Sequence, residues 1–377
     1  MRVLCASDSF KGSLSSERIG SIVRDATKEV FPDSSCKIII TSDGGEGFLS
    51  AFKAVKGGEY IFAKVKDALL RDFTSKYLLT KDCAVISVAE VVGLDLLTPD
   101  ERDPTFTSSY GVGQLIYDAV KKGYENIIVA LGGSSTCDGG IGALKALGVD
   151  FRSENGASLK GVGGDLGKIK EISLKKACDL KKINLTLLCD VKSRLLGTRG
   201  ASLFYARQKG ADDRTVRQLE DGMRSYAKKV SDTFGCAVDF EGGGAAGGIG
   251  FALKTFFGAK IKSGIDYILD MNDFDKELKK TDLVISGEGK TDSQTGEGKV
   301  VAGVAKRCKK FGKPLIIITG GIGDDIGPLY ETGVTAIFSI ANKPMDISEA
   351  IGNAEKLYYL SVKNVLKTIK VCEAFKK

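Results

Sequence analysis

Short hydrophobic runs alternate with amphipathic stretches at both ends of the chain. Residues 17–31 place Ile19, Ile22 and Val23 on one face at helical spacing, with Ser15 or Ser16 as the candidate cap. Similar helical stretches separate five apolar runs, which we predict to be strands at residues 3–6, 37–41, 283–286, 315–319 and 336–340. Five strands joined by helices are typical of an α/β fold with a flavodoxin-like doubly wound parallel sheet.

The middle of the chain interrupts this alternation. Residues 60–66, 73–79 and 83–89 alternate apolar and polar side chains, which predicts short antiparallel strands. Helical periodicity follows, most clearly at residues 216–234. We therefore predict a discontinuous flavodoxin-like α/β domain, residues 1–58 plus 282–377, split by an inserted mixed α+β domain, residues 59–281, with the active site in the cleft between them.

Composition narrows the class of protein. The 377 residues are 43% hydrophobic and are enough for two domains. The net charge of +7 lies largely in lysine pairs such as Lys121 and Lys122, which are typical of solvated helix faces, and no nucleic-acid partner is expected. The chain has no histidine, which excludes histidine triads and most zinc sites, so a general base must be Asp, Glu, Lys, Tyr or Cys.

The cysteines and the first residues bear on localisation. The nine cysteines show no C-x-x-C spacing, and Cys5, Cys83 and Cys189 lie in apolar runs, as we expect of a reduced, cytoplasmic protein. The chain opens on a predicted strand, without the charged lead and apolar core of a signal peptide. No apolar run approaches the roughly 18 residues of a membrane span, so no membrane partner is expected.

Five predicted strands run directly into loops in which acids or hydroxyls stand among glycines or other small residues. These strand-to-loop stretches begin at Val3, Ile38, Ile127, Leu185 and Leu283. Ligands of open α/β sheets bind outside the carboxyl ends of the strands. Glycine there lets backbone N–H groups approach an anion closely, and carboxylates can hold a cation. The pattern therefore predicts one site for phosphate and metal, and with it phosphoryl transfer.

Each loop also has a purely structural interpretation. Asp43 could cap a tight turn, Asp190 could cap the end of its strand, and Lys209 could neutralise a helix C-terminus. Residues 132–140, however, hold three hydroxyls and one carboxylate among four glycines, which is more than a turn requires. Residues 286–299 carry two lysines and three acids without the spacing of a Walker A motif. We favour a functional role for these last two loops.

The same loops resemble those of the type 1 glycerate kinases. The matching stretches, in family order, are DSFKGSL from Asp8, DGGEG from Asp43, SYGVGQLI from Ser109, GGSSTCDGG from Gly132, GASLFYARQKGA up to Ala211, GGGAAGGIG from Gly242 and SGEGKTDSQTGEGK from Ser286. The chain departs from the family pattern at Cys137, where Asn is usual, near residues 192–194, and at Val300 and Val301, where a Pro is usual. The resemblance implies phosphorylation of D-glycerate by ATP and Mg²⁺, in most members at the 2-hydroxyl.

This chemistry needs cations on the phosphates, carboxylates for the metal and a base for the hydroxyl. We assign catalysis to Asp190 as the base and to Lys11 and Lys290. The predicted metal ligands are Asp43, Glu288 and Asp292. The predicted substrate- and phosphate-binding residues are Asp8, Ser9, Asp43, Gly44, Gly45, Gly132, Gly133, Ser134, Ser135, Asp138, Lys209, Gly287 and Lys299. Asp43 and Asp292 are the alternative bases, and Lys11 or Arg71 could hold the substrate carboxylate.

Other functions remain as alternatives. The acceptor could be another small hydroxy acid. A nicotinamide-dependent oxidoreductase predicts G-x-G-x-x-G after the first strand, where the residues from Ser7 to Lys11 lack the glycines. A two-lobed solute-binding protein would normally carry an export signal. We expect ATP and D-glycerate as small-molecule partners and a homodimer as a possible assembly.

Overall fold

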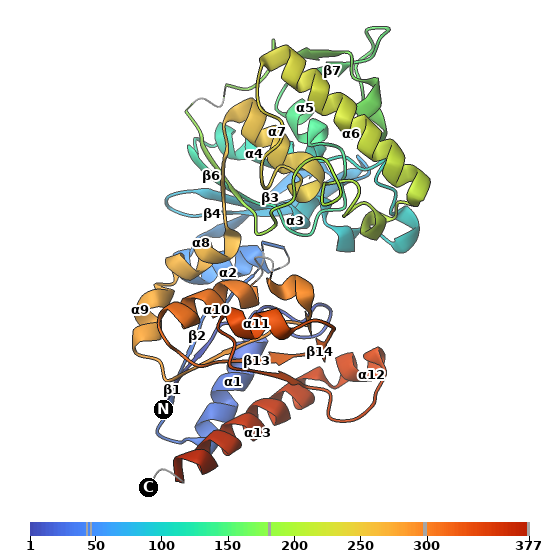
Figure 1. The fold of residues 1–377 in the computed structure, drawn as a ribbon. Helices are drawn as coiled ribbons and strands as arrows, with labels where there is room; N and C mark the ends of the chain where they lie inside the picture. Colours follow the sequence, from blue (N-terminus) through green and yellow to red (C-terminus); the bar gives the residue numbers. More distant parts are fainter. Residues whose placement is uncertain (43, 46, 180–181, 297–299, 375–377) are drawn as a thin grey trace. The chain divides into compact units, whose positions relative to one another are not determined.

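The chain folds into two compact units (Figure 1). The computed structural model describes residues 1–42, 44–45, 47–179, 182–296 and 300–374. Unit 1 comprises Met1–Asp43 and Ile265–Lys377, and unit 2 comprises Gly44–Gly264. Asp43 and Lys299, two of the predicted site residues, lie outside the described residues.

The unit boundaries fall at residues 43 and 264, whereas the sequence pattern placed them at 58 and 281. Helix α2 (Phe48–Lys56) contacts strands β4 (Asp72–Leu79) and β5 (Ala84–Ser87) of unit 2. Helices α8 (Gly264–Met271) and α9 (Phe274–Lys279) instead bury their apolar residues in the core of unit 1. Periodicity shows that a face is buried and not which sheet buries it, so the sequence pattern alone could not place these segments in one unit or the other.

Unit 1 is built on a five-stranded parallel sheet. In spatial order its strands are β2 (Ser35–Ile38), β1 (Arg2–Cys5), β11 (Leu283–Ser286), β13 (Leu315–Thr319) and β15 (Ala336–Ser339). Numbered along the chain, this order is 2-1-3-4-5, and every neighbouring pair is parallel. All five strands predicted for this sheet are present at or beside their predicted positions.

Helices cover both faces of this sheet (Figure 1). They are α1 (Ser16–Val30), α12 (Ile347–Gly352) and α13 (Ala354–Ala374), together with α9, α10 (Val300–Lys310) and α11 (Gly327–Thr332). Val3 and Cys5 of β1 pack with α1 and α13, whereas Leu4 packs with α9 and α10. Because successive strand residues point to opposite faces, a strand that is apolar throughout must be covered on both sides. Ser15 is the N-cap of α1 and accepts a hydrogen bond from the Arg18 backbone N–H.

Unit 2 contains a six-stranded mixed sheet. Strands β10 (Lys260–Lys262), β9 (Asn184–Leu188), β6 (Asn126–Ala130) and β5 are parallel, β4 is antiparallel to β5, and β3 (Glu59–Lys66) is antiparallel to β4. The prediction for residues 83–89 was therefore partly wrong, because β5 ends at Ser87 and pairs in parallel with β6. The parallel part brings the loops after β5, β6, β9 and β10 to one edge of the sheet.

The helices of unit 2 enclose two apolar clusters. They are α2, α3 (Ala89–Val92), α4 (Tyr110–Lys121), α5 (Ile141–Ala146), α6 (Asp213–Phe234) and α7 (Ile249–Phe257). The longest, α6, begins after the capping residue Asp212 and ends at Gly235, whose φ of 64° suits glycine. Its apolar face, which includes Leu219 and Tyr226, packs in one cluster with Phe151 of β7 (Asp150–Arg152), which pairs with β8 (Glu171–Ser173).

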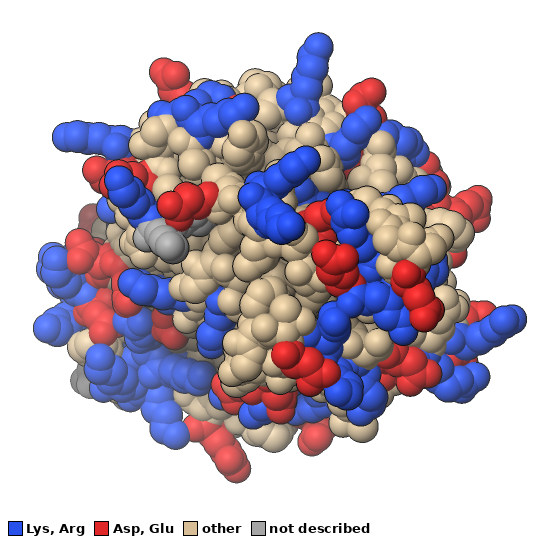
Figure 2. Space-filling model, turned by 90° about the horizontal axis from the view of Figure 1, so that it is seen from above, with Lys and Arg blue, Asp and Glu red and all other residues tan. Residues whose placement is uncertain are grey.

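The surface carries mixed charges (Figure 2), and the structure contains free cysteines. Lysine and arginine side chains mix with acidic ones over the face seen in Figure 2. Exposed ion pairs such as Lys228–Asp232 occur on the surface. All nine cysteines are free. In the part of the chain that the structure describes, no helix combines the length and the apolar composition needed to cross a membrane.

Candidate functional site

In unit 1, hydrogen bonds join the loops after β1 and β11 at the carboxyl edge of the sheet. The Ser7 hydroxyl and the Asp8 backbone N–H both donate to the Gly287 carbonyl, at 3.0 and 2.9 Å. A Cβ at Gly287 would lie 1.9 Å from the Ile318 carbonyl oxygen, so only glycine fits there. Asp8 in turn accepts a hydrogen bond from the Ser9 backbone N–H at 2.8 Å. The predicted residues 8, 9 and 287 are thus brought together.

The loop after β11 holds its acids and lysines in different surroundings. Glu288 is buried, and its carboxylate accepts a hydrogen bond from the Thr291 hydroxyl at 3.3 Å. Lys290 is 68% exposed and forms a 3.3 Å ion pair with Asp292. Lys11 lies on an exposed turn beside this loop. A Cβ built at Gly289 would lie 3.8 Å from the backbone nitrogen of Lys11. Two cations and two carboxylates therefore stand at one edge of unit 1.

These two carboxylates fit part of a magnesium site. Mg²⁺ in phosphoryl-transfer enzymes is held by one or two carboxylates together with phosphate oxygens and water. Glu288 and Asp292 supply that number. Within the described ranges, no group of three or more acid or cysteine side chains converges on a possible metal position. Glu288 and Asp292 are therefore the described carboxylates of this loop that could contribute to such a site.

In unit 2, two glycine loops touch each other. The Gly132 backbone N–H donates to the Gly44 carbonyl at 3.2 Å, and a Cβ at Gly132 would lie 2.5 Å from the Gly45 nitrogen. Gly133 adopts a φ of 72°, in the left-handed region that favours glycine. These four predicted residues therefore lie together, although the Gly132 N–H is already used within the protein.

Asp138 supports this loop from inside. It is fully buried and accepts hydrogen bonds from the Ser109 N–H and hydroxyl, both at 2.7 Å, and from the backbone N–H groups of Gly140 and Gly142, at 3.0 and 3.1 Å. Burial raises the pKa of Asp138, and these donors oppose the shift. A carboxylate with four donors has little capacity left for a ligand. The structure thus gives Asp138 a supporting role where the sequence predicted contact with the substrate.

The Asp138→Asn variant is expected to lose about 3 kcal/mol of unfolding free energy, because an amide NH₂ would face backbone donors that now find an acceptor. Urea denaturation measures the loss. Asp239→Asn is the control, since Asp239 is 62% exposed in its ion pair with Arg194 and exposed pairs contribute at most about 1 kcal/mol. Wild-type stability combined with lost turnover would instead place Asp138 in contact with the ligand.

Lys209 reaches into the same loop from a different part of the chain. It ends the short helix η4 (Arg207–Lys209), and its Nζ donates to the Ser134 hydroxyl at 3.1 Å and to the Thr136 carbonyl at 2.7 Å. Only 4% of the residue is exposed. Burial lowers the pKa of Lys209, while the nearby Cys137 and Asp138 oppose the shift. Lys209 is therefore not an exposed lysine at a helix end, as the purely structural interpretation of its sequence position would require.

Asp190 follows β9 at the carboxyl edge of the unit 2 sheet. Ala130 of β6 and Leu188 of β9 are the last register partners, and Gly132 and Asp190 each follow the end of their strand by two residues. The Asp190 carboxylate is half-buried and accepts a hydrogen bond from the Ser263 hydroxyl at 2.8 Å. The predicted base thus lies at the same sheet edge as the loop that carries Ser134.

Two other predicted residues are engaged elsewhere. The Arg71 guanidinium donates to Asp67 and to Glu101, both at 2.6 Å, so its charge is already paired. Of the two residues predicted as candidates to hold the substrate carboxylate, Lys11 and Arg71, Arg71 is therefore already engaged within the protein. The Ser135 hydroxyl donates to the Val92 carbonyl at 2.9 Å and anchors its loop to the end of α3.

Position 137, where the chain departs from the family pattern, is a packing position. Cys137 is fully buried, and its thiol lies 3.6 Å from the Ala201 carbonyl oxygen. Burial raises the pKa of this thiol, so it stays protonated and unreactive.

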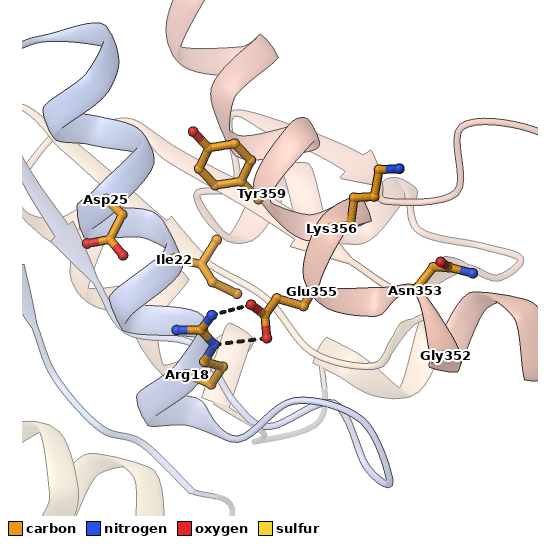
Figure 3. Close-up of a pocket in the computed structure, with 8 residues that line it drawn as sticks. All are labelled: Arg18, Ile22, Asp25, Gly352, Asn353, Glu355, Lys356 and Tyr359. Carbon is orange, nitrogen blue, oxygen red and sulfur yellow. Dashed lines mark hydrogen bonds and ion pairs between the residues drawn. The ribbon is translucent and has the colours of Figure 1, made fainter.

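Figure 3 shows a surface pocket of about 490 Å³ that does not belong to this site. Its lining residues are Arg18, Ile22, Asp25, Gly352, Asn353, Glu355, Lys356 and Tyr359. They come from α1, α12 and α13 and the turn between the last two, and Arg18 and Glu355 span the pocket with two hydrogen bonds. Ligands of doubly wound sheets bind at the strand ends and not among the covering helices, so we do not place the active site here.

Known proteins resemble the chain over almost its whole length. Residues 3–370 match the glycerate kinase family. The chain is 36% identical to a glycerate kinase of Bacillus cereus (strain ATCC 10987 / NRS 248) and 35% identical to a glycerate 2-kinase of Escherichia coli (strain K12), in each case over 98% of both chains. It also matches the crystal structure of a protein from Salmonella typhimurium LT2 assigned as glycerate kinase 2, with a TM-score of 0.82, 34% identity and 99% of both chains covered.

An α/β fold whose strand ends gather lysines, acids and close glycine turns suits an enzyme of the kinase class. The comparisons agree: the chain belongs to the glycerate kinase family. The resemblance inferred from its loops is thereby confirmed. The alternatives of an oxidoreductase and a solute-binding protein receive no support from these relatives.

Proposed function

We propose that this enzyme transfers the γ-phosphoryl group of ATP to the 2-hydroxyl of D-glycerate, giving 2-phosphoglycerate and ADP. The match of nearly the whole chain to the glycerate kinase family carries the proposal. A relative of similar length that is named glycerate 2-kinase supports the 2-position. Mg²⁺ bound with ATP would neutralise charge that develops on the phosphates.

The loops of unit 1 suit the nucleotide. Lys11 and Lys290 are exposed and can turn their ammonium groups to phosphate oxygens. Glu288 and Asp292 would hold Mg²⁺. The present ion pair between Lys290 and Asp292 shows that the lysine already stands beside an anionic oxygen.

Asp190 is the proposed general base, with Asp43 and Asp292 as alternatives. In a chain without histidine, a carboxylate is the natural acceptor for the hydroxyl proton. As Asp190 takes this proton, the acceptor oxygen forms a bond to the γ-phosphorus. The bond between that phosphorus and the β–γ bridging oxygen breaks, and its electron pair leaves with ADP. The half-buried position of Asp190 beside the glycine loop supports this role.

We also propose that unit 1 is a flavodoxin-like domain that unit 2 interrupts. The strand order 2-1-3-4-5 and the helices on both faces of the sheet support the assignment. That fold binds its ligands at the carboxyl ends of the strands, where Asp8 and Gly287 lie.

The proposed function is tested by ADP release at saturating ATP and Mg²⁺, measured with and without D-glycerate. We expect release to rise with D-glycerate and not with L-lactate, the control acceptor, and to stop when EDTA removes the metal. Phosphorus NMR of the product distinguishes 2- from 3-phosphoglycerate. Absence of glycerate-dependent ADP release would contradict the proposal.

A further inference from the structure

Lys209 is a buried cation whose hydrogen bonds go only to uncharged groups. Its Nζ contacts the Ser134 hydroxyl and the Thr136 carbonyl, and in the part of the chain described no acid forms an ion pair with it. Asp138 lies near enough to influence its pKa but is already engaged by four other donors. A buried charge is costly unless an opposite charge compensates it. The missing counter-charge indicates an anionic ligand.

The donors around Lys209 are also incompletely used. An ammonium group has three N–H donors, and Lys209 spends two of them. Ser134 is 7% exposed and accepts the bond from Lys209, but its own O–H donates to no acceptor among the described residues. One N–H and one O–H are therefore left next to each other, which matches the two oxygens of a carboxylate.

The backbone of a second basic residue, Arg102, packs beside the turn that carries Lys209. Its carbonyl oxygen would lie 1.8 Å from a Cβ at Gly210, so its backbone packs directly against the residue that follows Lys209. The Arg102 Nε is buried and has no hydrogen-bond partner among the described residues. Such orphaned buried donors are rare in folded proteins unless a ligand or water completes them. Arg102 carried no signal in the sequence pattern, since it stands outside the glycine loops.

We propose that Lys209, Ser134 and Arg102 form the subsite that binds the carboxylate of the substrate. The inference rests on the proposed function and names the group of D-glycerate that unit 2 holds. Asp190 and the loop that carries Ser134 follow the neighbouring strands β9 and β6, whose last register partners are Leu188 and Ala130. A 2-hydroxy acid carries its hydroxyl on the carbon next to the carboxylate, so a base and a carboxylate site at one sheet edge suit it. The acids expected to accompany phosphate and metal, Glu288 and Asp292, belong to unit 1.

The test compares KM values for the two substrates in single variants. Lys209→Met should raise the KM for D-glycerate by about 10- to 100-fold, the range expected for a lost charge-assisted hydrogen bond. The KM for ATP should change by less than about twofold. The melting temperature should not fall, since the variant removes a buried, uncompensated charge. Ser134→Ala should raise the KM for D-glycerate by about 3- to 10-fold, as for a neutral hydrogen bond.

Lys145→Met is the matched control, because Lys145 is a largely buried lysine of unit 2 that faces Asp150. It should leave both KM values unchanged. A rise in the KM for ATP in Lys209→Met would assign the anion to a phosphate and overturn the inference. If Lys209→Met does not fold, Ser134→Ala decides, and an unchanged KM for D-glycerate in that variant overturns it. A wild-type enzyme without glycerate-dependent ADP release would instead remove the proposed function itself.

Discussion

The Asp190→Asn variant is expected to turn over D-glycerate about 10³-fold more slowly than the wild type, within the range of general-base catalysis. The amide keeps the shape of the carboxylate and an oxygen for the Ser263 hydroxyl, which lies 2.8 Å from Asp190, but it cannot accept a proton. Binding of ATP should not change, because only the chemical step loses a participant. Steady-state kcat and equilibrium binding of ATP measure the two quantities.

The same Asp239→Asn control applies here, because it removes an exposed carboxylate of unit 2 without touching the proposed site. If Asp190→Asn loses Mg²⁺–ATP binding, Asp190 is a metal ligand, and Asp43 or Asp292 becomes the base to test. Undiminished turnover would leave Asp190 as the cap of its strand.

The pH–rate profile of the wild type should lack a limb from an imidazole that titrates at about pH 6.5, since the chain contains no histidine.

The strands of unit 1 were predictable because each is a short apolar run covered on both faces. Burial of Val3 and Leu4 on opposite sides of β1 is the physical cause of that pattern. The sequence pattern does not show whether a neighbouring strand runs parallel or antiparallel. For this reason β5, which is antiparallel to β4 but parallel to β6, was predicted to be an antiparallel strand. Short helices such as α8 and α9 escaped prediction, since fewer than three turns leave little periodicity to detect.

For the candidate site, too, the sequence could predict some features and not others. Glycines and acids after strands pointed to the loops at the carboxyl ends of the strands, because that signal depends on residue type and local position. Which side chains face a ligand depends on contacts far apart in the chain. Asp138 looked like a ligand-binding acid until its donors from Ser109 were seen, and Lys209 meets Ser134 across 75 residues of sequence. Long-range packing therefore decides the roles that composition leaves open.

The Lys290→Ala variant is expected to lower kcat by about 10²–10³-fold, the usual loss when a group that stabilises transition-state charge is removed. Lys290 is 68% exposed and pairs with Asp292 at 3.3 Å, so its ammonium group can reach the γ-phosphoryl group and stabilise the charge that develops on it. Lys11→Ala should lower kcat by a similar factor, since Lys11 stands at the same edge of unit 1. Thermal unfolding should be nearly unchanged in both, because exposed ion pairs contribute little to stability.

Lys276→Ala is the matched control for Lys290→Ala. Lys276 is 72% exposed and pairs with Asp273 at 2.7 Å in the same unit. Its loss removes a comparable surface ion pair between two residues that are not predicted to belong to the site. Its kcat should equal that of the wild type. A Lys290 variant that behaves like this control would show that the Lys290–Asp292 pair is only a surface contact, and the same result for Lys11 would remove that residue from the site. A fall in melting temperature as large as the fall in kcat would argue that the lysine supports the loop after β11, and the phosphate would then need another cation.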